Sequence, residues 1–175
     1  MKIFQYVLAV SLVLLSSTVS ASEPKASPQA QQKFWALTEQ IAIALPGDGR
    51  DLRRLIPSAA LHPDRSSGGP VSSQPTEIGP SLFANDVAVV MGKNNRADSV
   101  SFDLSGSCIP FSSVRKRYPN LIVVNQAADD LEWNTLGTQV GDSIIAFWFQ
   151  GTKFGCMRKV DITPASKTLS RLNVN

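Results

Sequence analysis

The stretch SIIAFWFQGTKFGCMRKVDI, residues 143–162, predicts a β-hairpin. The apolar runs 143–149 and 154–162 flank the turn sequence QGTK at 150–153, and two such runs around a short turn form an antiparallel pair. In the return strand, alternation is expected to place two sets of side chains on opposite faces: Phe154, Cys156, Val160 and Ile162 on one side, Met157, Lys159 and Asp161 on the other.

A helix is predicted well before this hairpin. Ser27 is a favoured N-cap residue, and Pro28 suits the first helical position. Apolar residues then recur at helical spacing until Pro46: Phe34, Leu37, Ile41 and Leu45. We expect an amphipathic helix of about 17 residues whose apolar stripe packs in the core. Residues 48–56 add a short helical turn.

Between this helix and the hairpin, the pattern predicts two strands, a short helix and a third strand. The run 87–91, the turn 93–95 and the alternating run 100–104 form a hairpin. Pro110 opens a helix that ends before Pro119, and residues 121–124 read as a buried strand. No strong pattern follows Pro164. The order of helix, two strands, helix and three strands fits an antiparallel sheet with helices on one side.

Cys108 and Cys156 are the two cysteines of the chain. In an oxidising compartment such a pair favours a disulfide, which would close a loop of about 49 residues and stabilise the fold by ~4 kcal/mol. The alternative is a reactive thiol, which needs a nearby base, and the one histidine, His62, lies in a remote proline-rich segment. The expected fold is therefore α+β: a mainly antiparallel β-sheet with one or two helices packed on one side and one disulfide.

The first 21 residues resemble a cleaved signal peptide. Lys2 gives a positive start, residues 7–15 form a short apolar core, and the small residues Val19 and Ala21 place cleavage before Ser22. The apolar run is too short to span a bilayer, so no stable membrane insertion is expected and the predicted location is the periplasm. Residues 22–175 then form a single α+β domain. Within it, the Pro/Ser/Gly-rich segment 57–80 is expected to be a loop without its own core, and disordered.

Charge and composition exclude several classes of function. The formal net charge of +3 falls to +2 once Lys2 leaves with the leader, which is too small a surplus to indicate nucleic acid as a partner. One histidine and two cysteines offer little for a metal site, and no cofactor is expected.

Motifs for catalysis are absent from the sequence. It contains no G-x-S-x-G elbow, P-loop, H-E-x-x-H or repeated C-x-x-C. The carboxylates Asp129, Asp130 and Glu132 could in principle do acid–base work or hold calcium, but they lack the spacing of an EF-hand loop and read as a solvated turn. The basic run 115–117 is typical of a solvated helix face, although it could also meet an acidic partner. We therefore expect a protein that is not an enzyme.

The segment SGSCIPFSS, residues 105–113, carries a resemblance to a known family. A leader, a domain of this size and adjacent serines beside a mid-chain bend resemble the periplasmic immunity proteins of type VI secretion that neutralise cell-wall amidase effectors with a Cys–His catalytic pair. The resemblance implies that a serine-bearing loop enters the amidase cleft and hydrogen-bonds around the catalytic histidine. The matching residues here are Ser112 and Ser113, with Ser107 and Phe111 in the same partner-binding loop. The Ser-Gly-Ser stretch is also similar to the loop of periplasmic lysozyme inhibitors, where a tyrosine stands in the place of Phe111.

Two questions stay open at this point. Ser112 and Ser113 lie near a predicted helix start, where serines are also common as helix caps. These two serines therefore either cap the helix or bind the amidase. For the whole protein, the first hypothesis is a secreted non-catalytic inhibitor, an immunity protein against a peptidoglycan-degrading amidase toxin. The second is a cell-envelope module that binds a peptide or ligand, or assists assembly, through the open face of its sheet. A hydrolase with carboxylate catalysis is the third.

Overall fold

The computed structural model describes residues 23–47, 49–56, 60–62, 74–92 and 96–172. Residues 1–22, which include the predicted leader, and residues 57–59 and 63–73 of the proline-rich segment lie outside this part of the chain. Along the sequence the described elements are α1 (Pro28–Ala44), α2 (Gly49–Leu55), β1 (Ala60–His62), β2 (Thr76–Gly79), β3 (Leu82–Met91), β4 (Ala97–Gly106), α3 (Phe111–Arg117), β5 (Ile122–Asn125), β6 (Trp133–Val140), β7 (Ser143–Gln150), β8 (Met157–Pro164) and α4 (Ala165–Arg171).

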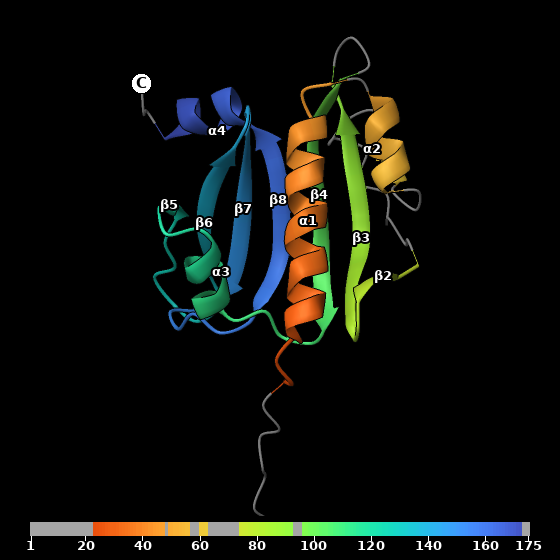
Figure 1. Cartoon of the computed structure of the whole chain (residues 1–175). Helices are drawn as coiled ribbons and strands as arrows, with labels where there is room; N and C mark the ends of the chain where they lie inside the picture. The colour runs from red at the N-terminus through yellow and green to blue at the C-terminus, as the bar shows by residue number, and fades with distance from the viewer. Residues whose placement is uncertain (1–22, 48, 57–59, 63–73, 93–95, 173–175) are drawn as a thin grey trace, which may run out of the picture.

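The strands form one sheet in the order β1-β3-β4-β8-β7-β6-β5, and β2 pairs with β3 beside this path (Figure 1). The pair β1–β3 is parallel, and the other strand pairs are antiparallel. The hairpin expected at residues 143–162 is β7–β8, which lies at the centre. The fold is thus α+β with a mainly antiparallel sheet.

Helix α1 covers one face of the sheet, as Figure 1 shows. Its predicted start is confirmed: the Ser27 side chain accepts a hydrogen bond from the Ala30 N–H, 3.1 Å away, and Pro28 is the first helical residue. Phe34, Ile41 and Leu45 are fully buried against the sheet. The Ser143 hydroxyl of β7 donates to the Ala42 carbonyl at 2.7 Å, which fixes the helix on the strand by a buried polar contact.

Two predictions about the strands are wrong, and one strand was missed. The proline-rich segment 57–80 is not wholly a loop, because β1 and β2 lie within it, and His62 pairs with Val90 in β1. Residues 121–124 are not a buried strand: β5 is an edge strand, and Val123 is 58% exposed. The strand β6 was not expected, because polar residues and a glycine separate the apolar residues of its sequence, WNTLGTQV.

The faces of the sheet on which the side chains around β8 lie also differ from the prediction. Trp148 pairs with Lys159, but the next residue, Phe149, pairs with Met157, so Arg158 is an extra residue in a β-bulge. A bulge moves the following side chains to the other face of the sheet. Met157 is therefore buried in the core, while Phe154 is 40% exposed.

No helix in the described part of the chain is long and apolar enough to cross a membrane. Helix α4 was not expected either; it packs against β7 and β8 at their upper end in Figure 1. There the Thr168 and Thr163 hydroxyls lie 2.7 Å apart in a hydrogen bond.

Candidate functional site

The residues of the family resemblance lie on the loop that joins β4 to α3 and runs along the lower end of the sheet (Figure 1). Residues 151–156, which connect β7 to β8, lie beside this loop, because the disulfide joins the two segments. We call residues 107–113 together with residues 151–156 the Cys108 rim.

The predicted disulfide between Cys108 and Cys156 is present, with an S–S distance of 2.06 Å and a Cα–Cα distance of 5.1 Å. It removes the alternative of a reactive thiol. The group Glu23, Cys108 and Cys156 brings three potential metal ligands together, but its two sulfurs are bonded to each other and are not thiolates.

Backbone hydrogen bonds hold the loop on both sides of the disulfide. The Cys108 N–H donates to the Pro24 carbonyl and the Ala26 N–H donates to the Cys108 carbonyl, each at 2.7 Å. On the other side, the Met157 N–H donates to the Ile109 carbonyl at 2.9 Å. Residues 108–109 therefore run as a short extended segment between two neighbours, which restricts their backbone.

Ser112 and Ser113 do not cap α3. The N-cap is Pro110, which makes no side-chain capping bond, and the two serines occupy the second and third helical positions. Ser112 is exposed and Ser113 is half-buried. Within the part of the chain that the structure describes, neither hydroxyl has a hydrogen-bond partner, and the same holds for the half-buried Ser107. The capping explanation for these serines is thus wrong.

Phe111 belongs to an aromatic cluster. Its ring stacks on Phe154 with centroids 4.4 Å apart and meets the edge of Phe149, which is fully buried, at 5.7 Å. Phe111 therefore anchors the rim to the core, while Phe154 presents the exposed ring. Sequence alternation placed Phe154 on the inner face, and the bulge at Arg158 is the reason that this residue was missed.

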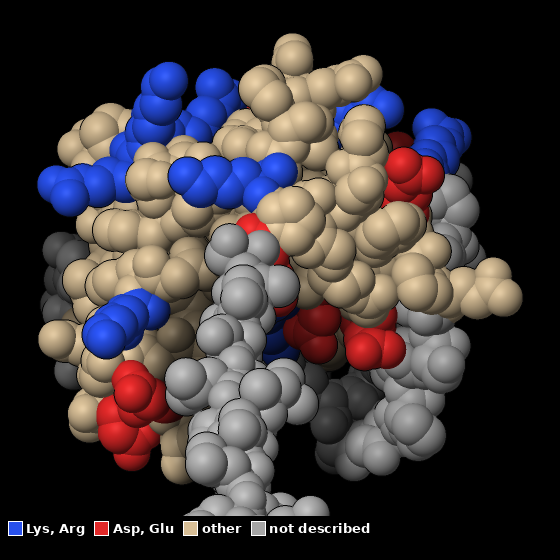
Figure 2. Space-filling model, turned by 90° about the horizontal axis from the view of Figure 1, so that it is seen from below, with Lys and Arg blue, Asp and Glu red and all other residues tan. Residues whose placement is uncertain are grey.

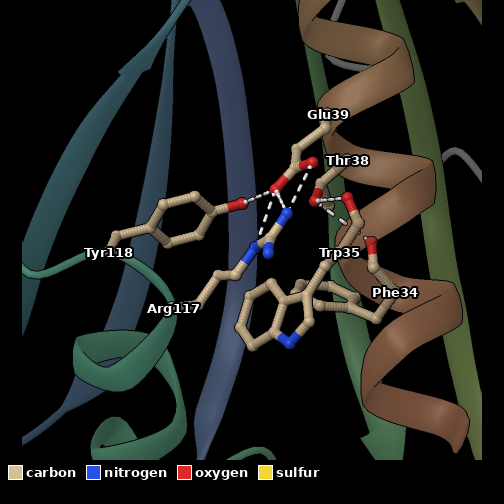
Figure 3. Close-up of polar contacts among 6 residues, drawn as sticks. All are labelled: Phe34, Trp35, Thr38, Glu39, Arg117 and Tyr118. Atoms are coloured by element: carbon tan, nitrogen blue, oxygen red, sulfur yellow. Dashed lines mark hydrogen bonds and ion pairs between the residues drawn. The ribbon is translucent and has the colours of Figure 1, made fainter.

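The far end of α3 is fastened to α1 by the contacts drawn in Figure 3. The Arg117 guanidinium donates to both carboxylate oxygens of Glu39, at 2.8 and 3.0 Å, and the Tyr118 hydroxyl donates to Glu39 at 2.6 Å. The Tyr118 ring also stacks on Phe147 of β7, with centroids 5.6 Å apart. The segment from Cys108 to Tyr118 is thus fixed at one end by the disulfide and at the other by Glu39.

Burial and the hydrogen bond to Glu39 raise the pKa of Tyr118 above its ordinary value of 10.0. Folding raises this pKa, so the contribution to stability is complete below about pH 10 and is lost as the pH rises through the folded-state value. In a chain that starts at Ser22, Tyr118 is the single tyrosine. We expect its phenolate absorbance to be absent from the folded chain just above pH 10, where a free tyrosine is mostly ionised, and to appear in urea.

In the variant Glu39→Gln, the pKa of Tyr118 should be lower than in the wild type but still above its ordinary value, because burial is the larger cause of the shift. Glu77→Gln, on an exposed residue of β2, is the control and should leave the titration unchanged. Normal ionisation of the folded wild-type chain would show that Tyr118 is not buried as described, and an unchanged titration in Glu39→Gln would show that the contact with Glu39 does not form.

The acidic residues 129–132 serve the turn structure. Asp130 accepts hydrogen bonds from the Thr152 hydroxyl at 2.7 Å and from the Thr152 N–H at 3.2 Å, and these bonds lower the pKa of its carboxyl group. Asp129 accepts from the Leu131 N–H, and Glu132 from the Ala128 N–H, both at 2.8 Å. These carboxylates fix the loop beside residues 151–152 and so support the rim.

Charges at this end of the molecule are separated, as Figure 2 shows: lysine and arginine side chains gather mainly in the upper half of the view and carboxylates in the lower half. On α3, Arg115 and Lys116 are exposed, whereas Arg117 is engaged with Glu39. On the other side of the rim, Lys153 is exposed and Arg158 pairs with Glu23 at 2.8 Å. A partner that contacts α3 would therefore meet two cations that make no ion pair in the described structure.

Comparisons of the chain with protein-family models, with curated proteins and with solved structures find no match. The class of protein that the fold defines is an α+β domain with a mainly antiparallel sheet and one disulfide.

Proposed function

We propose that this protein is a secreted, non-catalytic inhibitor: an immunity protein that binds and blocks a peptidoglycan-degrading amidase toxin in the periplasm. The observation that carries the proposal is the state of Ser112 and Ser113. Their hydroxyls have no partner among the described residues, and they stand on a segment that is fixed at both ends. The leader, residues 1–21, would bring the protein to the compartment where such a toxin acts.

The rim suits inhibition for two physical reasons. A loop that is rigid before binding loses little conformational entropy on binding, so more of the contact energy remains as affinity. A hydroxyl can both donate and accept, so Ser112 and Ser113 can satisfy a catalytic imidazole in either protonation state. Ser107, with its free hydroxyl, and the Phe111–Phe154 stack would border that contact.

The proposal also states what the protein does not do. Its own groups perform no chemistry, so inhibition would be stoichiometric and would leave the protein unchanged. The partner is a secreted cell-wall amidase effector with a Cys–His pair, in accord with the family that residues 105–113 resemble. The exposed cations Arg115 and Lys116 favour a cleft with carboxylates near its margin.

The test is a titration of the purified protein against the candidate amidase acting on peptidoglycan fragments. Loss of both hydroxyls leaves the buried imidazole without a partner, which costs ~1–3 kcal/mol, so the double variant Ser112→Ala/Ser113→Ala should bind roughly ten- to a hundredfold more weakly.

The matched control is Ser166→Ala. Ser166 is an exposed serine at the second position of α4, a short helix that also follows a proline N-cap without a capping bond. This variant should inhibit as the wild type does. Equal inhibition by the double variant would remove the two serines from the mechanism, and no binding to the amidase at all would refute the proposal.

A second candidate is a cell-envelope module that binds a ligand on its sheet. The observation that favours it is a hollow on the sheet face opposite α1, lined by two tryptophans. This hollow is separate from the serines of the rim.

A further inference from the structure

The sheet face opposite α1 carries a row of polar and aromatic side chains. Phe102, Phe147 and Val160 point into the core, so the residues that follow or precede them in their strands point away from it. Strand register then aligns five residues from five neighbouring strands, in the order Asn85, Asp103, Lys159, Trp148 and Thr135.

Beside this row lies a hollow of about 450 Å³. The side chains that matter for binding are those of Asp103, Trp133, Trp148, Gln150, Arg158 and Lys159. The two indoles meet edge to face, with centroids 6.1 Å apart and planes at 72°, and both are half-buried. Their rings therefore offer an apolar surface in the middle of the hollow, with hydrogen-bonding groups around it.

The cations of the hollow are compensated by nearby carboxylates. Lys159 lies 3.8 Å from the Asp161 carboxylate and 5.6 Å from the centre of the Trp148 ring. Arg158 pairs with Glu23 at 2.8 Å. A site for a phosphate or a nucleotide would need cations free to make charge-assisted bonds, and here both are engaged. With both cations engaged and the Asp103 carboxylate in the lining, an anionic ligand is disfavoured.

The position of the hollow argues against an extended peptide. Peptides that bind sheets add a strand at an open edge, where backbone groups are free. This hollow is lined by β4, β8, β7 and β6, whose backbones pair with one another in the interior of the sheet. Recognition must therefore go through side chains.

Two polar atoms have no hydrogen-bond partner in the described structure, one in a residue that lines the hollow and one in its cross-strand neighbour. The Trp148 Nε1 and the Thr135 Oγ1 are both buried, and these two residues form one cross-strand pair. Buried donors without acceptors are rare in folded proteins. The Lys159 ammonium lies over the Trp148 ring, so movement of this long side chain would expose more of the indole to a ligand.

We propose that this hollow binds a neutral oligosaccharide, with one pyranose ring packed against Trp133 and Trp148 and its hydroxyls bonded to Asp103, Gln150 and Lys159. Such a ligand offers an apolar face, hydroxyls that donate and accept, and no charge. The inference deepens the second candidate function and is independent of the inhibitor proposal, since it uses none of the rim serines.

The experiment is a tryptophan-fluorescence titration of the chain starting at Ser22 with chitotriose and, separately, cellotriose. Trp35 is buried in the core, so a change in emission reports Trp133 and Trp148. We expect saturable binding of at least one trisaccharide. Trp148→Phe should weaken it about tenfold and Gln150→Ala about fivefold. Gln150 is exposed, so its variant leaves the fold intact and keeps the test decisive.

The control is Phe154→Ala, which removes an exposed aromatic ring at the rim and should leave saccharide affinity unchanged. Ser112→Ala/Ser113→Ala should also bind the sugar normally, so failure of this inference and failure of the inhibitor proposal can be told apart. No binding of either trisaccharide up to about 20 mM, well above millimolar affinities, would overturn the inference. So would binding of adenosine monophosphate in place of the sugars, or sugar binding that survives both hollow variants.

Discussion

Replacing both Cys108 and Cys156 by alanine is expected to lower the free energy of unfolding by about 4 kcal/mol, which follows from the chain entropy of a closed loop of this length. The two residues are 48 positions apart, so the bond restricts a large part of the unfolded chain. It also joins the loop after β4 to the loop before β8, and these two loops form the rim. The measurement is urea unfolding of wild type and variant, followed by far-ultraviolet circular dichroism.

Two controls accompany this measurement. The wild-type protein unfolded under reducing conditions should match the alanine variant, because both lack the same bond. Native oxidised protein, treated with an alkylating reagent, should show no free thiol by mass spectrometry. Two alkylated cysteines, or an unchanged urea midpoint after reduction, would show that the bond does not hold this fold together.

The variant Gly106→Ala should also be strongly destabilising, by about 3 kcal/mol. Gly106 ends β4 with a positive φ of 85°, a conformation that costs an alanine about 1–2 kcal/mol. A Cβ atom there would in addition overlap the Ser81 carbonyl oxygen, which accepts a hydrogen bond from the Ser107 N–H at 2.6 Å. Relieving that overlap requires a shift of the backbone. Overpacking that forces such a shift costs about 1–3 kcal/mol.

Gly141→Ala is the matched control, since it separates the two effects. Gly141 has a positive φ of 58°, but a Cβ atom there would meet nothing within 4 Å. We expect this variant to show the conformational cost alone, about 1 kcal/mol. Equal urea midpoints for the two variants would mean that the approach of Ser81 to Gly106 is not tight, and that the start of the rim is free to move.

Physically, the rim and the hollow are linked by the bulge at Arg158. The extra residue turns Met157 into the core and Arg158 toward Glu23, and it leaves Phe154 exposed at the rim. It also precedes Lys159, which lies in the hollow beside Trp148. One irregularity in β8 therefore sets the side chains of both surfaces, even though the residues proposed to bind are different.

Local sequence patterns were sufficient for the main elements of the fold. Ser27 and Pro28 define the start of α1 because capping and proline geometry act within one helical turn. The runs around residues 150–153 define β7 and β8 because alternation and a turn are local features. The disulfide was predictable from the presence of two cysteines behind a predicted leader. These signals depend on neighbouring residues, so a single sequence contains them.

Tertiary structure decided what depends on distant residues. Strand β6 is stable because its eight residues pair with β7 and its Gly137 lets Ile144 and Val124 approach closely, and neither fact is visible in its own sequence. The same is true of Glu39, which meets Arg117 and Tyr118 from 78 and 79 residues away. Trp133 and Trp148 come together only through strand register. Local propensity and chemistry thus specify helices α1, α2 and α3, the central hairpin and the disulfide, whereas the surfaces proposed to bind arise from long-range packing.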